Sequence, residues 1–262
     1  SPQPVSFDGS GVFAQAGGET TVTLQGKGKA REVAYTTVEP VLVRISGAAR
    51  SVRGRLSVGG GQAFVEARQS GETVDARATL DGVDVATLST DFAGKVTARA
   101  TLQGQGGRLT GNLEADLENA RSLDAPANLA VDGRIRATLD DSRLRIAASA
   151  VNEAGLKAAA NLDLPAEASA QPLRLAVNRT QPMRGDFNAE GELRSLWDLF
   201  FGSERTLSGR LDASGTIAGT LASPRLRGTA NVGNGQFRDA ATGLQLRNLT
   251  VAADLADTAV VV

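Results

Sequence analysis

The 262-residue sequence predicts an all-β protein built on one long, twisted, mostly antiparallel sheet. Apolar and polar residues alternate along many segments, which is the period of a strand with one apolar face. These segments are joined by short turns, too short for the crossover that parallel strands need. Apart from a cluster at residues 195–201, the chain shows no sustained helical period.

The composition bears on what the apolar face of this sheet packs against, and it leaves both a closed sandwich core and a curved sheet with an open interior as alternatives. Aromatic residues make up 4% of the chain, while there are 30 glycines. A filled β-sandwich core of this size would hold more large aromatic side chains. Small side chains on the apolar face favour a curved sheet with an open or shallow interior.

The first third of the chain alternates in separate pieces. Residues 41–45 and 63–67 form compact strands, and from residue 73 the alternation is regular. A one-residue shift at Asp81-Gly82 predicts a β-bulge or a tight turn. Residues 26–29, Gly-Lys-Gly-Lys, lack the spacing of a phosphate-binding loop and are predicted to form a hairpin tip.

The middle third predicts an antiparallel meander. Residues 129–139 keep one parity for eleven positions, and residues 144–150 resume it. The pair Asp140-Asp141 between them could serve acid/base chemistry or calcium, but its place between two strands favours a turn. The predicted groove residues here are Leu129, Val131, Ile135, Leu139, Leu144 and Ile146.

One short helix is predicted at residues 195–201. Ser195 is a suitable N-cap and Gly202 a suitable stop for this apolar cluster. A helix this apolar is expected to be buried, plugging or bridging the apolar side of the sheet. The alternative is a helix that binds a membrane surface or a partner.

The last third contains the clearest alternation, at residues 207–237. Ser223-Pro224 is predicted to break it, because proline has no N–H for a strand ladder. The turn signal Gly233-Asn234-Gly235 follows. The predicted groove residues here are Leu211, Ile217, Leu221, Leu226 and Val232.

The composition argues against several functions. Charge is balanced, 28 Lys and Arg against 29 Asp and Glu, so no nucleic-acid partner is expected. The absence of His and Cys removes the commonest general base, transition-metal ligands and thiol nucleophile. We therefore expect no enzyme activity, no catalytic residue, no metal and no cofactor.

The chain has no apolar run of 18 residues and no signal-peptide pattern at its start. It ends on Ala259-Val260-Val261-Val262, which is strand-like in character. We expect residues 1–262 to be one continuous β-groove segment of a longer protein. Any membrane anchor is then expected outside this chain.

Residues 193–255 contain a series of turn and strand motifs: Leu207-Ser208-Gly209, then Gly219-Thr220-Leu221 and Pro224, followed by Asn234-Gly235 and Gly243-Leu244-Gln245-Leu246-Arg247-Asn248-Leu249. In this series the chain resembles TamB-like proteins and, more loosely, the AsmA-like proteins of bacterial envelopes. These positions are turn glycines and a strand-break proline, so no catalytic residue follows from them. Residues 1–192 share with these proteins only the general pattern of long, alternating strands with few aromatic residues.

The resemblance implies a β-taco, a long sheet curled into an open apolar groove. It implies a periplasmic location in a Gram-negative bacterium, with the full-length protein anchored in the inner membrane. It also implies an outer-membrane partner of the Omp85 class, similar to TamA. The implied cargo is phospholipid or the strands of outer-membrane proteins, including autotransporters during their assembly.

Two hypotheses follow from the sequence. In the first, the apolar groove shields acyl chains or amphipathic β-strands between the two membranes. In the second, the chain is a structural or adhesive β-repeat spacer with a closed core and no cargo. An open groove needs a guest or a cover, because large exposed apolar patches are rarely left bare.

Overall fold

The computed structural model describes residues 5–30, 33–87, 89, 91–201 and 204–259. Over these ranges the chain forms one open antiparallel sheet of 16 strands and one short α-helix, which confirms the predicted fold class. The strands are β1 (Val5–Ala16), β2 (Glu19–Ala30), β3 (Val33–Ser46), β4 (Ala49–Val58), β5 (Gly61–Ser70), β6 (Thr73–Asp84), β7 (Phe92–Gln105), β8 (Arg108–Ser122), β9 (Val131–Asp140), β10 (Arg143–Val151), β11 (Lys157–Ser169), β12 (Arg174–Val177), β13 (Arg184–Glu192), β14 (Arg205–Thr220), β15 (Ser223–Asp239) and β16 (Gln245–Ala259).

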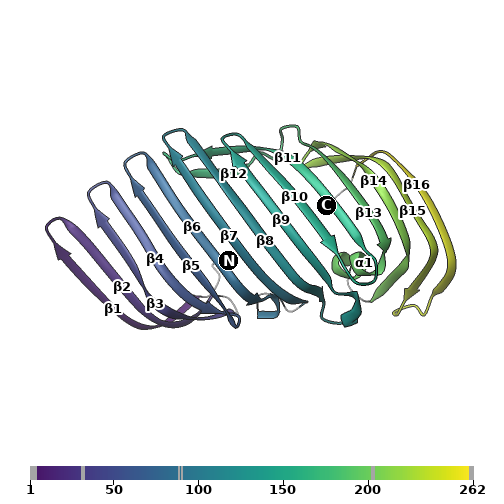
Figure 1. Cartoon of the computed structure of the whole chain (residues 1–262), viewed down its shortest axis with the longest axis horizontal. Coiled ribbons are helices and arrows are strands. Elements are labelled where there is room, and N and C mark those ends of the chain that lie inside the picture. The colour runs from purple at the N-terminus through teal and green to yellow at the C-terminus, as the bar shows by residue number, and fades with distance from the viewer. Residues whose placement is uncertain (1–4, 31–32, 88, 90, 202–203, 260–262) are drawn as a thin grey trace.

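The order of strands in the sheet follows their order in the chain (Figure 1). The exception is β12, which pairs only with β11, so that β13 returns to the other part of β11. Fifteen strands therefore lie on one path. At about 4.8 Å between neighbours, this path is roughly 67 Å long.

The two rims of the sheet are built differently (Figure 1). The upper rim carries tight two-residue turns, in which Gly17, Gly71, Gly106 and Asp141 have φ between 48° and 57°. Positive φ gives the turn the twist that a hairpin needs. The lower rim carries the two-residue turn Gly59-Gly60 between β4 and β5, and it also carries longer connections, which include η1 (Val85–Thr87), η2 (Ala127–Leu129) and the helix α1 (Arg194–Phe201).

The strand register gathers apolar residues on one face of the sheet. Paired residues in neighbouring strands point to the same side, so a row of pairs can be followed across the sheet. One unbroken row from β4 to β16 contains no polar side chain. Its members are Leu56, Ala63, Leu80, Ala98, Ala115, Ile135, Ala148, Ala160, Phe187, Gly215, Gly228 and Leu255.

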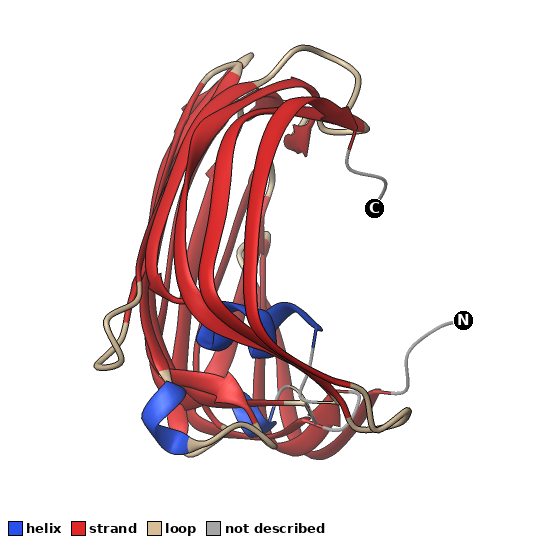
Figure 2. Ribbon diagram, turned by 90° about the vertical axis from the view of Figure 1, so that its right-hand side faces the viewer, coloured by secondary structure: helices blue, strands red, loops and turns tan. Residues whose placement is uncertain are grey.

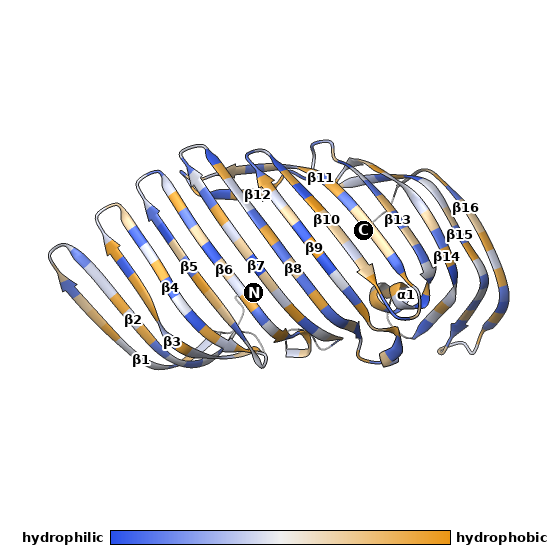
Figure 3. Cartoon of the chain, viewed as in Figure 1, coloured by the Kyte–Doolittle hydropathy of each residue, from blue (hydrophilic) through white to orange (hydrophobic). Residues whose placement is uncertain are grey.

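We call the side that carries this row the inner face. The sheet curls around one of its sides, and α1 lies inside the curl (Figure 2). The apolar and polar residues that alternate along each strand are visible in Figure 3. The opposite side, with the charged residues of the same strands, is the outer face.

The predicted hairpin tip at residues 26–29 is wrong, because these residues lie within β2. Their glycines make room for neighbours instead of forming a turn. A Cβ on Gly28 would lie 2.6 Å from the Tyr35 hydroxyl oxygen. The predicted turn at residues 233–235 likewise lies within β15, where Asn234 (φ 52°) forms part of a bulge. The bulge predicted at Asp81-Gly82 is present, since the register shifts between Leu80 and Val83.

The end of β11 leaves the main sheet and crosses the upper rim. Residues 165–177, which we call the strap, include this end and β12 (Figure 1). Backbone hydrogen bonds join Ala166 N–H to the Ser142 carbonyl (2.7 Å) and Ala170 N–H to the Gly106 carbonyl (2.9 Å). The strap therefore spans the turns of two hairpins.

Candidate apolar groove

The structure places nine of the eleven predicted groove residues on the inner face. In one group Leu139 pairs with Leu144, and in the other Leu211 pairs with Val232 and Ile217 with Leu226. The two groups share one face because the register runs unbroken through β11 and β13. The nine residues are Val131, Ile135, Leu139, Leu144, Ile146, Leu211, Ile217, Leu226 and Val232.

Leu129 and Leu221 do not lie on strands. Leu129 ends the short helix η2 at the lower rim and is buried. Leu221 lies in the two-residue turn between β14 and β15, where 40% of its surface is exposed. Both continue the apolar alternation of the adjacent strand. A prediction from alternation alone therefore placed the end of each strand too far along the chain. At Leu221 the turn precedes Ser223-Pro224, and Pro224 itself pairs with Gly219.

The upper rim of the inner face is covered by the strap. Ala166 and Ala170 pack there with Val74, Leu109 and Leu139 in one buried cluster. Small residues allow the close approach, since a Cβ on Gly104 would lie 2.9 Å from the Ala170 Cβ. Leu109 on β8 packs beneath the strap, and none of its surface is exposed.

The lower rim is covered in the region of α1. The helix contacts β14 and β8, and the Trp197 indole N–H donates to the carbonyl of Arg205. Four apolar residues in the lower part of the sheet and in the turn before β11 are buried. They are Ala120, Val131, Leu156 and Leu211.

The middle of the inner face stays open between these two covers. Val65, Leu113 and Ile135 are 42%, 37% and 44% exposed, although they lie in the centre of long strands. Ile135 has only alanines beside it, Ala115 on β8 and Ala148 on β10. The result is an apolar groove that is closed in part at its rims and accessible along its floor.

The predicted helix is present, but its buried side is polar. Ser195 and Asp198 are each 2% exposed, whereas Phe201 is 66% exposed. The Ser195 hydroxyl accepts a hydrogen bond from the Asn152 amide at 2.6 Å and so joins α1 to the turn before β11. The Trp197 and Phe201 rings contact each other, with centroids 4.4 Å apart. The prediction of a fully buried apolar plug is therefore wrong at Phe201.

The helix begins at Arg194, so Ser195 is not its cap. The Glu192 carboxylate takes that role, because it accepts a hydrogen bond from the Arg194 backbone N–H. The predicted stop at Gly202 lies outside the described residues.

Asp198 is a buried carboxylate without a hydrogen-bond donor among the described residues. It forms an ion pair with Arg194, whose Nε lies 3.4 Å from Asp198 Oδ2. Loss of water raises the pKa of Asp198 above its usual range, although Arg194 acts in the opposite direction. Burial of this carboxylate in its charged form is therefore unfavourable, and Arg194 offsets only part of that cost.

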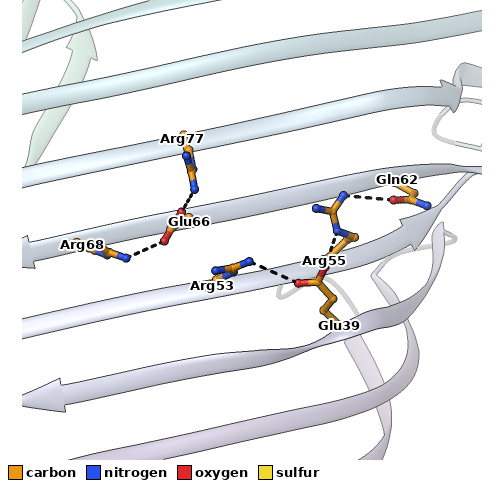
Figure 4. A network of polar contacts seen from close by, with 7 residues as sticks. All are labelled: Glu39, Arg53, Arg55, Gln62, Glu66, Arg68 and Arg77. Atoms are coloured by element: carbon orange, nitrogen blue, oxygen red, sulfur yellow. Dashed lines mark hydrogen bonds and ion pairs between the residues drawn. The ribbon is translucent and has the colours of Figure 1, made fainter.

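The outer face carries ion pairs between residues of the same and of neighbouring strands. On β3 to β6, Glu39 contacts Arg53 and Arg55, while Glu66 contacts Arg68 and Arg77 (Figure 4). The guanidinium groups of three of these arginines surround the Phe64 ring at 5.1 to 5.7 Å. This aromatic side chain is therefore masked by charge and does not extend the apolar surface.

Further along the outer face, Arg134 contacts Asp116 at 2.6 Å and Arg143 contacts Asp163 at 2.8 Å. The hydrogen bond from Arg143 lowers the pKa of Asp163. The part of the chain with assigned structure contains no cluster of metal-ligating side chains and no helix long and apolar enough to cross a membrane. The Asp140-Asp141 pair forms the turn that was predicted.

The sequence prediction missed the N-terminal half of the inner face. Residues such as Val22, Val43, Val52, Val65 and Leu80 share the face that carries Ile135. The signal was the same alternation. Relating the strands needed the pairing register, which two-residue turns fix but the longer connections after β6 and β8 do not.

Comparisons with models of protein families, with curated proteins and with solved structures find no match to this chain.

Proposed function

We propose that this chain is a periplasmic segment of a TamB-like envelope protein whose inner face shields acyl chains or amphipathic β-strands from water. The observation that carries the proposal is the open floor of the groove. Apolar side chains at its centre stay 37% to 44% exposed on an inner face that extends across the sheet. Exposed apolar surface of this extent is typical of a site that receives an apolar guest.

The resemblance of residues 193–255 to TamB-like proteins gives the proposal its biological setting. In that setting, the longer protein is anchored in the inner membrane of a Gram-negative bacterium and works with an outer-membrane partner of the Omp85 class. Phospholipid is the first cargo to test, because acyl chains need only an apolar surface and no fixed register.

The alternative, a spacer with a closed core, requires a second layer to cover the inner face. The described strands form one open sheet, and the strap and α1 cover only its rims. A spacer without cargo would therefore leave the floor of the groove in contact with water, at a cost of about 25 cal/mol for each Å² of apolar surface.

The test is the lipid content of the purified chain by native mass spectrometry, before and after incubation with phosphatidylglycerol vesicles. Ile135→Arg places a charge on the floor of the groove. Asn112→Arg is the matched control, because Asn112 is exposed on the outer face between Thr101 and Thr138. We expect wild type and the control to carry lipid and folded Ile135→Arg to lose it.

A wild-type chain that takes up no lipid under either condition would contradict the lipid function. A folded Ile135→Arg variant with full lipid occupancy would contradict a lipid-binding groove that includes Ile135.

A further inference from the structure

The helix α1 buries polar side chains and exposes an aromatic one. Ser195 and Asp198 are each 2% exposed, whereas Phe201 is 66% exposed and stacks against Trp197 with ring centroids 4.4 Å apart. At about 100° for each residue of a helix, the side with Trp197 and Phe201 is turned about 110° from the buried side. A surface helix usually packs by its apolar side. We call Trp197 and Phe201 the aromatic pair, and its exposure makes it a candidate contact site.

The aromatic pair lies on the inner side of the sheet. The helix contacts β8 and β14, and Figure 2 shows it inside the curl. Ala120, Val131 and Leu211 point to the inner face in the lower parts of β8, β9 and β14, and all three are buried. The hydrogen bond between Asn152 and Ser195 holds the polar side of α1 against the turn before β11. The apolar side of α1 is therefore left inside the curl, on the same side of the sheet as the open floor of the groove.

Hydrogen bonds to the backbone fix the aromatic pair in this place. One carboxylate oxygen of Glu192 accepts from the backbone N–H groups of Arg194 and Gly209, each at 3.1 Å, and so ties the start of α1 to β14. The indole N–H of Trp197 donates to the carbonyl of Arg205. Because the polar atom of the indole ring is satisfied within the chain, the rest of the ring offers only apolar surface to a guest.

The nature of this wall distinguishes between the two guests of the proposed function. Backbone N–H and C=O groups along an α-helix bond to each other, so the side of α1 offers no partner to the backbone of a β-strand. A strand laid against it would bury polar backbone groups without partners, which is unfavourable. An acyl chain has no polar group to satisfy. The aromatic pair therefore suits an acyl chain better than a strand.

We propose that Trp197 and Phe201 form a wall of the groove near its lower rim and contact the acyl chains of a bound phospholipid. The inference rests on the proposed function, to which it adds two contact residues and a choice of acyl chains over β-strands. Phe201 supplies the larger free surface, and Trp197, which is half-buried, supplies the ring that it stacks on.

The test uses Trp197, the one tryptophan of the sequence, whose fluorescence reports on this position alone. The purified chain is incubated with vesicles of phosphatidylglycerol whose acyl chains carry bromine, which quenches tryptophan fluorescence at short range. The protein is then separated from the vesicles by size exclusion, and its bound lipid is measured by native mass spectrometry. Phosphatidylglycerol without bromine gives the reference fluorescence.

Two variants accompany the wild-type chain. Phe201→Ser removes the exposed ring, and Phe64→Ser is the matched control. Phe64 lies on the outer face, between Arg55 and Thr79 of the neighbouring strands. We expect bromine to quench Trp197 in the separated wild-type and control proteins. Phe201→Ser is expected to keep the wild-type circular dichroism spectrum and to bind lipid about tenfold more weakly, because covering the exposed part of a phenylalanine contributes about 1.4 kcal/mol.

The outcomes separate the inference from the proposed function. If wild type carries lipid but bromine does not quench Trp197, or if Phe201→Ser binds lipid as tightly as wild type, the acyl chains lie elsewhere; the inference is then overturned and the groove function stands. Quenching that disappears when the vesicles are removed would assign the aromatic pair to a membrane surface and would also overturn the inference. A wild-type chain that carries no lipid contradicts the proposed function itself, and the inference with it.

Discussion

Placing one arginine at two positions of the inner face tests whether the groove is open in solution. Ile135 is 44% exposed and its cross-strand neighbours are Ala115 and Ala148. Leu109 is fully buried beneath the strap. Ile135→Arg therefore probes the floor of the groove, and Leu109→Arg probes a covered part of the same face.

The expected costs differ because the surroundings differ. Full burial of an isoleucine side chain contributes about 1.5–3 kcal/mol, so a side chain that is a little more than half buried loses at most about 1–1.5 kcal/mol. The arginine stem regains part of this, because it can lie along the alanines while its charge reaches water. At Leu109 an unpaired charge would be buried, which costs about 3–5 kcal/mol.

Urea unfolding followed by far-UV circular dichroism measures both free energies of unfolding. We expect Ile135→Arg to keep the wild-type spectrum and to lose less than half as much stability as Leu109→Arg. Equal losses at the two positions would refute the open groove, because they would mean that Ile135 is as deeply covered in solution as Leu109.

Two other predictions concern α1 and one glycine of the sheet. Because burial raises the folded-state pKa of Asp198, the carboxylate favours folding below its ordinary value of 3.8 and opposes it as pH rises through the folded pKa. Asp198→Asn should therefore add about 1 kcal/mol of stability at pH 7 and almost none at pH 3.5 in urea titrations, and an equal gain at both pH values would contradict the buried carboxylate. Gly191 has a φ of 109°, and a Cβ there would collide with the backbone carbonyl of Gly155. Gly191→Ala should cost about 3 kcal/mol, whereas Gly233→Ala, where a Cβ meets no atom within 4 Å, should cost under about 1 kcal/mol; similar melting temperatures for the two variants would show that the sheet yields at Gly191.

The sequence alone was enough to predict the class of fold and to place most of the proposed groove residues on one face of the sheet. The side chains of a strand alternate between two faces, so Leu211, Ile217 and Val131 had to share a side with their own apolar neighbours. Short turns also required antiparallel pairing. Both are local properties, which is why the sequence predicted them without knowledge of the tertiary structure.

The alternation of apolar and polar residues could not show where strands end or which glycines form turns. Leu129 and Leu221 keep the parity of a strand but lie in a short helix and a turn. Gly26 and Gly28 have the composition of a tip but lie within β2, where they leave room for the backbone of β1 and for Tyr35. For the two glycines, the neighbouring strands β1 and β3 decided the outcome.

Only the tertiary structure decided what covers the inner face. The strap reaches Leu109 across several strands, and α1 turns Ser195 and Asp198 inward while Phe201 stays exposed. A hollow of about 400 Å³, lined among others by Arg194, Arg238 and Arg247, forms only where α1 and the lower ends of β14, β15 and β16 meet. These features depend on how strongly the sheet curls, and curl is the sum of small twists and bulges over fifteen strands, which a local pattern of residues does not fix.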